Sequence, residues 1–214
     1  MFRYTASLSL ATGLLSGAVV IDRVAVIAGK RVIKLSDIRR DLRLTQFMNR
    51  EPVNFSVTAR RQAAERLVDQ AIIRNEIARG GYQRPADSEA AELLNQLKRD
   101  RFGGADVRMR EELARYGLLE DQLREQLLWQ ITVLRFIDQR FRAGVLVTDE
   151  EVRAYYDSHL ADLKREYPRE NSFEELTPKI RSVLEGERIN QNFGNWLEEA
   201  RKRNPVEYRP EAFE

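Results

Sequence analysis

The pattern of apolar and polar residues changes its period near the start of the chain. Residues 23–28 and 32–35 are short apolar runs rich in β-branched side chains, and Gly29 and Lys30 follow the first run. Glycine at the first position after such a run favours a tight β-hairpin. From Ser36 onward the apolar residues recur at helical spacing. The pattern therefore predicts a hairpin followed by a helix that ends near Asn49.

Glycine residues mark the ends of four further predicted helices. These helices cover the segment from Thr58 to the glycine pair at 80–81, and residues 88–102, 107–116 and 119–142. The longest of the last three is predicted to be the spine of the fold, because its apolar stripe is too large to remain exposed. The stripe consists of Leu123, Leu127, Leu128, Ile131, Leu134, Ile137 and Phe141.

Two capping boxes predict where the later helices begin. Residues 148–151 and 172–175 both have a hydroxyl side chain followed three residues later by Glu, so each pair can satisfy free backbone amides at a helix start. Within the last helix, Pro178 predicts either a kink or a restart with Thr177 as the cap. This helix is expected to continue to about Arg203.

The segment after the last helix completes the predicted fold. Residues 206–209 follow Pro205 and are long enough for a short edge strand that joins the opening hairpin. We therefore expect a mainly α protein, a multi-helix module with a small antiparallel sheet formed by an N-terminal hairpin and a C-terminal strand.

The first 21 residues have the layout of a secretory leader. Arg3 precedes an uncharged run from Tyr4 to Ile21, and small residues at 16–18 suit cleavage after Ala18. Residues 1–18 are therefore predicted to be a signal peptide, and residues 19–214 a single exported helical domain. The alternative is an uncleaved membrane anchor, because about 17 to 25 apolar residues can span a bilayer.

Charge distribution argues against a nucleic-acid partner, and cysteine content argues against disulfide or thiol chemistry. The chain has 36 basic and 34 acidic residues and a formal net charge of +2. Its arginines lie among acidic residues in the predicted helices, which is typical of exposed helix faces, so we expect no nucleic-acid partner. The sequence contains no cysteine, which excludes disulfides and thiol chemistry.

The sequence offers no recognisable catalytic machinery. His159 is the one histidine, and the acidic doublets are adjacent residues whose side chains diverge on a helix. Motifs for nucleotide binding, phosphate binding or zinc proteolysis are missing from the sequence. We therefore expect neither an enzyme nor a metal or cofactor site.

Large apolar side chains are the remaining candidates for function. Most are expected in the core, but some could line a groove that meets varied partners, since methionines at helix ends adapt easily. The predicted client-binding residues are Met48, Phe102, Met109, Tyr116, Tyr155 and Tyr156.

Several segments, taken in order, resemble the SurA-type periplasmic chaperones, which are related to the extracytoplasmic parvulin-type prolyl isomerases. The closing segments, 195–202 and 206–208, are similar to the C-terminal helix and strand of that family. The segments similar to its N-terminal chaperone region are residues 22–29, 32–38, 65–73, 113–118, 123–127 and 147–156.

The resemblance implies an N-terminal lobe at 19–159, a linker at 160–171, and a closing helix and strand at 172–209. Twelve linker residues are too few for a parvulin domain, since a domain needs about 50, and His159 alone cannot supply the paired histidines of a parvulin site. The implied function is an ATP-independent holdase without cofactor or isomerase activity.

The implied clients are unfolded exported chains, in particular outer-membrane protein precursors. An alternative is a structural or assembly protein with one folded partner, attached to the membrane only if the leader is uncleaved. The oligomeric state is left open.

Overall fold

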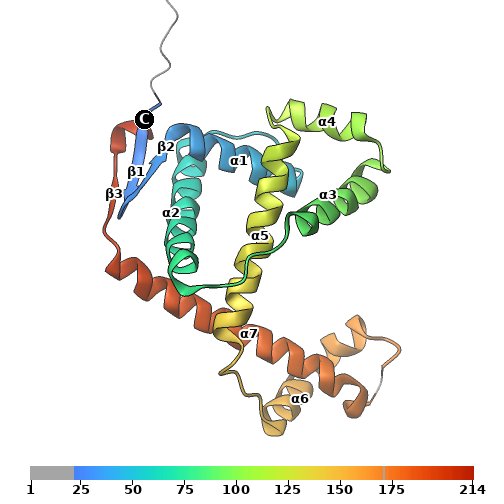
Figure 1. Cartoon of the computed structure of the whole chain (residues 1–214). Coiled ribbons are helices and arrows are strands. Elements are labelled where there is room, and N and C mark those ends of the chain that lie inside the picture. Colours follow the sequence, from blue (N-terminus) through green and yellow to red (C-terminus); the bar gives the residue numbers. More distant parts are fainter. Residues whose placement is uncertain (1–21, 171) are drawn as a thin grey trace, which may run out of the picture.

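The computed structural model describes residues 22–170 and 172–214. Within these residues it contains seven α-helices and one three-stranded sheet (Figure 1), which confirms the predicted mainly α fold with a small antiparallel sheet. The predicted signal peptide and its cleavage site after Ala18 lie outside the described residues.

The sheet joins two distant parts of the sequence. Strands β1 (Val24–Ala28) and β2 (Arg31–Lys34) form the predicted hairpin, and Gly29 at its turn has a φ of 58°, a conformation that glycine adopts without strain. Strand β3 (Val206–Tyr208) pairs antiparallel with β1, so the order is β2-β1-β3. The predicted edge strand is therefore confirmed.

The first core lies between this sheet and three helical segments. These are α1 (Leu35–Asn49), α2 (Val57–Gly80) and the end of α7 (Phe173–Arg203). Alanines on α2 allow close packing against the sheet. The buried residues of the first core include Val26, Ile38, Ala63, Ala64, Val68, Ala200 and Phe213.

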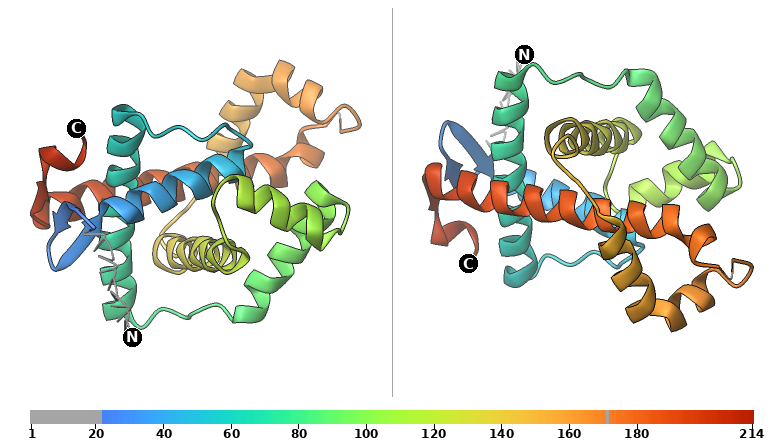
Figure 2. Two further views of the ribbon diagram at one scale, coloured as in Figure 1. Left: turned by 90° about the horizontal axis from the view of Figure 1, so that it is seen from above. Right: turned by 90° about the horizontal axis from the view of Figure 1, so that it is seen from below.

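The second core lies where α3 (Asp87–Phe102), α4 (Asp106–Arg115) and α5 (Glu120–Phe141) meet the end of α1. Viewed along its axis, α5 is surrounded by α1, α2 and α3 (Figure 2). The other helices cover most of its apolar stripe, but Leu134 is 67% exposed. Buried residues of the second core include Leu44, Phe47, Leu94, Met109, Leu113, Leu123 and Leu127.

Helix α6 (Asp149–Glu166) packs against the first half of α7 and forms the third core, at a distance from the sheet (Figure 1). Both predicted capping boxes are present, at Thr148 and Ser172. The buried residues of the third core are Val152, Leu163, Leu176 and Ile180.

Two details of this region differ from the sequence predictions. Residues 160–166 were predicted as linker but continue α6 after a local break at His159, because Leu163 is buried in the third core. Of the two alternatives predicted at Pro178, the restart is not found: α7 continues through this residue, and the Thr177 hydroxyl donates to the Phe173 carbonyl, 2.8 Å away, instead of capping a new helix.

Aromatic rings join α5 to the second half of α7. The centre of the Phe136 ring lies 4.9 Å from that of Tyr82 and 5.3 Å from that of Trp196, both in edge-to-face geometry. Phe141 and Phe193 complete this aromatic cluster. Helix α7 therefore contributes to the first core, the third core and the aromatic cluster.

Candidate functional site

The structure divides the six predicted client-binding residues between two places. Met48, Phe102, Met109 and Tyr116 gather at the second core, and Tyr155 and Tyr156 pack against the third core. They do not form one groove.

Met109 is the most deeply buried of the six, with 0% of its surface exposed. The short helix α4 directs Met109 and Leu113, one turn apart, into the second core. The Met109 side chain is therefore inaccessible to a client. Met48, Phe102 and Tyr116 are only partly buried and lie at the edge of the same core.

Specific contacts hold this edge in place. The Tyr116 hydroxyl donates to the Glu51 carbonyl at 2.9 Å, and its ring meets Phe47 edge-to-face. Arg101 donates to the Met48 carbonyl at 2.6 Å, at the end of α1. These groups already have protein partners, so their first role is to fix the end of α1.

The loop between α1 and α2 brings exposed apolar side chains close to this edge. Gln46 exchanges two hydrogen bonds of 3.0 Å with the backbone of Asn54, which holds the loop. Val53, Phe55 and Val57 remain exposed. The sequence pattern alone did not mark this loop as a candidate site, because its apolar residues follow neither helical nor strand spacing.

Tyr155 and Tyr156 have mainly local partners. The Tyr155 ring stacks on His159, with ring centres 4.1 Å apart, and Tyr156 meets Phe173 edge-to-face at 5.3 Å. His159 is exposed and its Nδ1 lies 3.0 Å from the Tyr155 carbonyl oxygen. These contacts stabilise α6 around its break.

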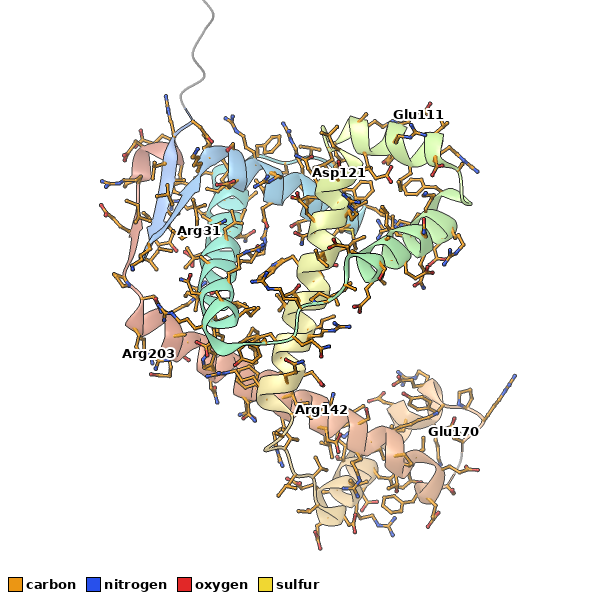
Figure 3. All side chains as sticks on the ribbon, in the orientation of Figure 1. Arg31, Glu111, Asp121, Arg142, Glu170 and Arg203 are labelled. Atoms are coloured by element: carbon orange, nitrogen blue, oxygen red, sulfur yellow. The ribbon has the colours of Figure 1, made fainter. Side chains whose placement is uncertain are left out.

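A more open site lies between α2 and α5, whose side chains project into the space between them (Figure 3). We call it the α2–α5 cleft. Its upper compartment, of about 130 Å³, is bounded by α2, α5, β2 and α1, and its lower compartment, of about 600 Å³, is bounded by α2, α5 and the segment leading to α3. Arg74, Glu125 and Trp129 line both compartments, so the two compartments adjoin at these residues.

A stacked pair marks the boundary between the compartments. The guanidinium carbon of Arg74, on α2, lies 3.7 Å from the centre of the Trp129 ring, on α5. Trp129 itself is buried against Ile73 and Phe136. Such cation–π contacts contribute about 0.5 to 2 kcal/mol, so the stack bridges two helices that otherwise diverge.

The two compartments differ in character. Apolar groups of the lower compartment come from Ile77, Pro85, Leu128 and Trp129. In the upper compartment, the Arg66 guanidinium binds Asp41 at 2.7 Å, and Gln70 also donates to this carboxylate. Burial nevertheless raises the pKa of Asp41, because desolvation outweighs the attraction of Arg66.

The cleft also carries arginines close to one another. Desolvation, followed by the charges of Arg31 and Arg40, lowers the pKa of Arg74, although Glu125 acts in the opposite direction. In the described ranges, neither Arg31 nor Arg74 has a carboxylate oxygen within 4.0 Å. The upper compartment is therefore a place where added negative charge would be favourable.

No group of three or more histidine, aspartate or glutamate side chains in residues 22–170 and 172–214 is placed to hold a metal ion. Within the same ranges, no helix combines the length and apolar character needed to cross a bilayer.

Comparison with known proteins does not assign the chain to a family. A scan against protein-family models found no match, and neither did a search of curated proteins.

Proposed function

We propose that this protein is an ATP-independent holdase that binds short extended segments of unfolded polypeptides in the α2–α5 cleft. The observation that carries the proposal is the open lower compartment of about 600 Å³, in which Ile77, Leu128 and Trp129 are already arranged by rigid helices. A preformed apolar cleft with a few polar groups is the usual form of a binding site.

The dimensions of the cleft suit a short peptide. Its α2 wall runs from Leu67 to Ala78, which is roughly 16 Å at a rise of 1.5 Å per residue. An extended chain advances about 3.3 Å per residue, so the cleft would hold about five client residues. This small contact favours weak binding, from which a client can escape without an energy source.

The exposed apolar loop between α1 and α2 offers a second point of contact. Val53, Phe55 and Val57 are exposed there, and the Tyr116 hydroxyl donates to the Glu51 carbonyl at the start of the same loop. A long unfolded chain could occupy this surface and the cleft at the same time, and two weak contacts on one chain strengthen each other.

The resemblance of the segments to SurA-type chaperones supports the same function and adds a location. It favours action in the periplasm on outer-membrane protein precursors, without prolyl isomerase activity and without a cofactor. The proposal therefore includes an exported protein whose predicted leader is removed after Ala18.

The test is aggregation of an unfolded outer-membrane protein with and without purified residues 19–214, in the absence of ATP. Suppression near equal molar ratio, with no binding to a folded control protein, is expected. No suppression would contradict the proposal and would favour the alternative of one dedicated folded partner.

Two substitutions on α5 test whether suppression of aggregation depends on the cleft. Leu128→Gln places a polar group in the lower compartment and should weaken suppression roughly fivefold, because about 1 kcal/mol of apolar contact is lost. Leu134→Gln changes an exposed residue that does not line the cleft and should retain full activity. Circular dichroism confirms that both variants are folded.

A further inference from the structure

Three arginines from three elements converge on the upper compartment of the cleft. Arg31 lies at the start of β2, Arg40 on α1 and Arg74 on α2, and all three line this compartment. We call them the arginine rim. Arg31 is labelled beside α2 in Figure 3.

Most carboxylates that line the same compartment are already hydrogen-bonded or ion-paired within the protein. Asp37 accepts hydrogen bonds from Arg40 and from the Lys34 amide, each at 3.0 Å. Asp41 accepts from Arg66 at 2.7 Å. Glu125, on the α5 wall, is left to face Arg31 and Arg74, and it lies beyond ion-pair distance of both. Two guanidinium groups therefore face one carboxylate.

The orientation of Arg74 leaves its donors available. Its contact with Trp129 uses the face of the guanidinium group, whereas the five N–H donors of arginine lie in the plane of that group. Within the described part of the chain, no hydrogen bond is formed by these donors. A guanidinium group in this state matches the two oxygens of a carboxylate.

We propose that the arginine rim binds a carboxylate of the client, so that the preferred segment is extended and has an acidic group next to an apolar residue. The apolar residue would occupy the lower compartment against Ile77 and Leu128, and the carboxylate would reach Arg74 and Arg31. This inference rests on the proposed function and names the class of segment that the holdase selects. An acidic side chain and a free C-terminus supply the same chemistry.

Three seven-residue peptides distinguish these sources. All share the same apolar residues and an acetylated N-terminus. The first has a central Glu and an amidated C-terminus, the second has Gln in place of Glu, and the third has Gln with a free C-terminal carboxylate. Binding to the purified protein is measured by isothermal titration calorimetry, with the quenching of tryptophan fluorescence as a second readout.

The Glu peptide is expected to bind roughly tenfold more tightly than the Gln amide, as one new charge-assisted contact would give. A similar gain for the third peptide would assign the preference to carboxylates in general, and no gain would assign it to acidic side chains. Equal affinity of all three peptides would overturn the inference.

Two substitutions test whether the preference for the Glu peptide comes from the arginine rim. Arg74→Gln and Arg31→Gln should each reduce the ratio of the Glu-peptide affinity to the Gln-amide affinity from roughly tenfold to about twofold or less, with both peptides measured on each variant. Arg61→Gln, an exposed position on α2 outside the cleft, is the matched control and should retain the advantage. A preference that survives both cleft substitutions would refute the inference.

These outcomes are separable from those of the aggregation test. Suppression of aggregation without any preference for acidic peptides would leave the holdase function standing and remove the inference about its clients. A carboxylate preference without suppression of aggregation would retain the arginine rim as a binding site and refute the holdase.

Discussion

At the scale of single residues, stability depends on a few side chains whose partners are far away in the sequence. Phe136 is almost completely buried where α5 crosses α7, and its ring is in edge-to-face contact with Tyr82, Phe141 and Trp196. Aromatic pairs of this geometry contribute about 0.5 to 1.5 kcal/mol beyond the burial of their area. Phe136 is therefore a central residue of this crossing.

We expect Phe136→Ala to lower the free energy of unfolding by about 3 to 5 kcal/mol, because the cavity cannot close between two rigid helices. Urea denaturation followed by circular dichroism measures this loss. Leu134→Ala, at an exposed position on the same helix, should change stability by less than about 0.5 kcal/mol. Equal effects of the two substitutions would contradict the packing of α5 described above.

Asp41 makes stability depend on pH in an unusual direction. Burial raises its pKa in the folded protein above the ordinary value of 3.8, so protonation of this group favours the folded state. Its contribution is complete below about 3.8 and is lost as the pH rises through the raised value. The free energy of unfolding of Asp41→Asn, relative to the natural chain, should therefore increase as the pH rises through this window.

Urea denaturation of both proteins between about pH 3 and pH 7 tests this expectation. Asp121→Asn, on the exposed surface of α5, serves as the control for loss of one negative charge. A difference between Asp41→Asn and the natural chain that falls with rising pH would show that the pair with Arg66 dominates over burial.

At the scale of elements, the local sequence pattern predicts the turns and helix ends that depend on residues close in sequence. The hairpin at Gly29, the helix starts at Thr148 and Ser172, and most helix ends follow from turn and capping residues close in sequence. The exceptions are residues 160–166 and the turn around Pro178, where buried Leu163, Leu176 and Ile180 keep the helices continuous. Tertiary packing there overrides the signals of a polar segment and of Pro178.

The candidate site was less predictable than the fold. The spacing of Met109 and Leu113 on α4 could have indicated that both face one core. The α2–α5 cleft exists because two helices diverge, and no local pattern encodes the distance between them. The contact of Trp129 with Arg74 joins two helices that are separated in the sequence by two others, so the sequence pattern did not indicate it.

The α6–α7 pair is an element with its own small core. Helix α6 contacts α7, and two α7 arginines also hold its entry, since Arg181 donates to the Val147 carbonyl at 2.5 Å and Arg188 binds Glu151 at 2.6 Å. The bond from Arg188 and the Thr148 cap both lower the pKa of Glu151. These contacts lie within residues 147–188 and do not involve the sheet, so we expect this region to open independently of it.

Leu176→Ala should selectively accelerate hydrogen exchange in α6 and the first half of α7, because the residue is buried in the third core. Exchange in β1 and α2 should be unchanged. Mass spectrometry of peptides from the exchanged protein measures both regions at once. Faster exchange throughout the chain would show that the third core is not an independent unit.

At the scale of the whole molecule, one arginine connects the sheet, α2 and α7. Arg201, on α7, donates to Asp69 at 2.5 Å and to Glu65 at 2.8 Å, and Glu65 in turn accepts from the Tyr208 hydroxyl at 2.5 Å. Desolvation and the Glu65 carboxylate raise the pKa of Tyr208. This network closes the fold where its two ends meet.

Arg201→Ala should lower the free energy of unfolding by about 1 to 2 kcal/mol, since it leaves two half-buried carboxylates without their main partner. Arg124→Ala, which breaks an exposed pair with Asp121, should cost less than about 0.5 kcal/mol. Thermal denaturation of the two variants provides the comparison. Similar losses would mean that the Arg201 network contributes no more than an ordinary surface ion pair.

The pairing of β3 with β1 has a consequence for synthesis on the ribosome. Arg60 donates to the carbonyl of Phe213, 153 residues further along the chain, and the first core also needs Ala200. A nascent chain can form its helices early but cannot complete this core until those distant residues emerge, and contacts of such high sequence separation form slowly. During that interval Val26 and Val68 remain uncovered, so we expect the incomplete chain to expose apolar surface that could associate with other chains.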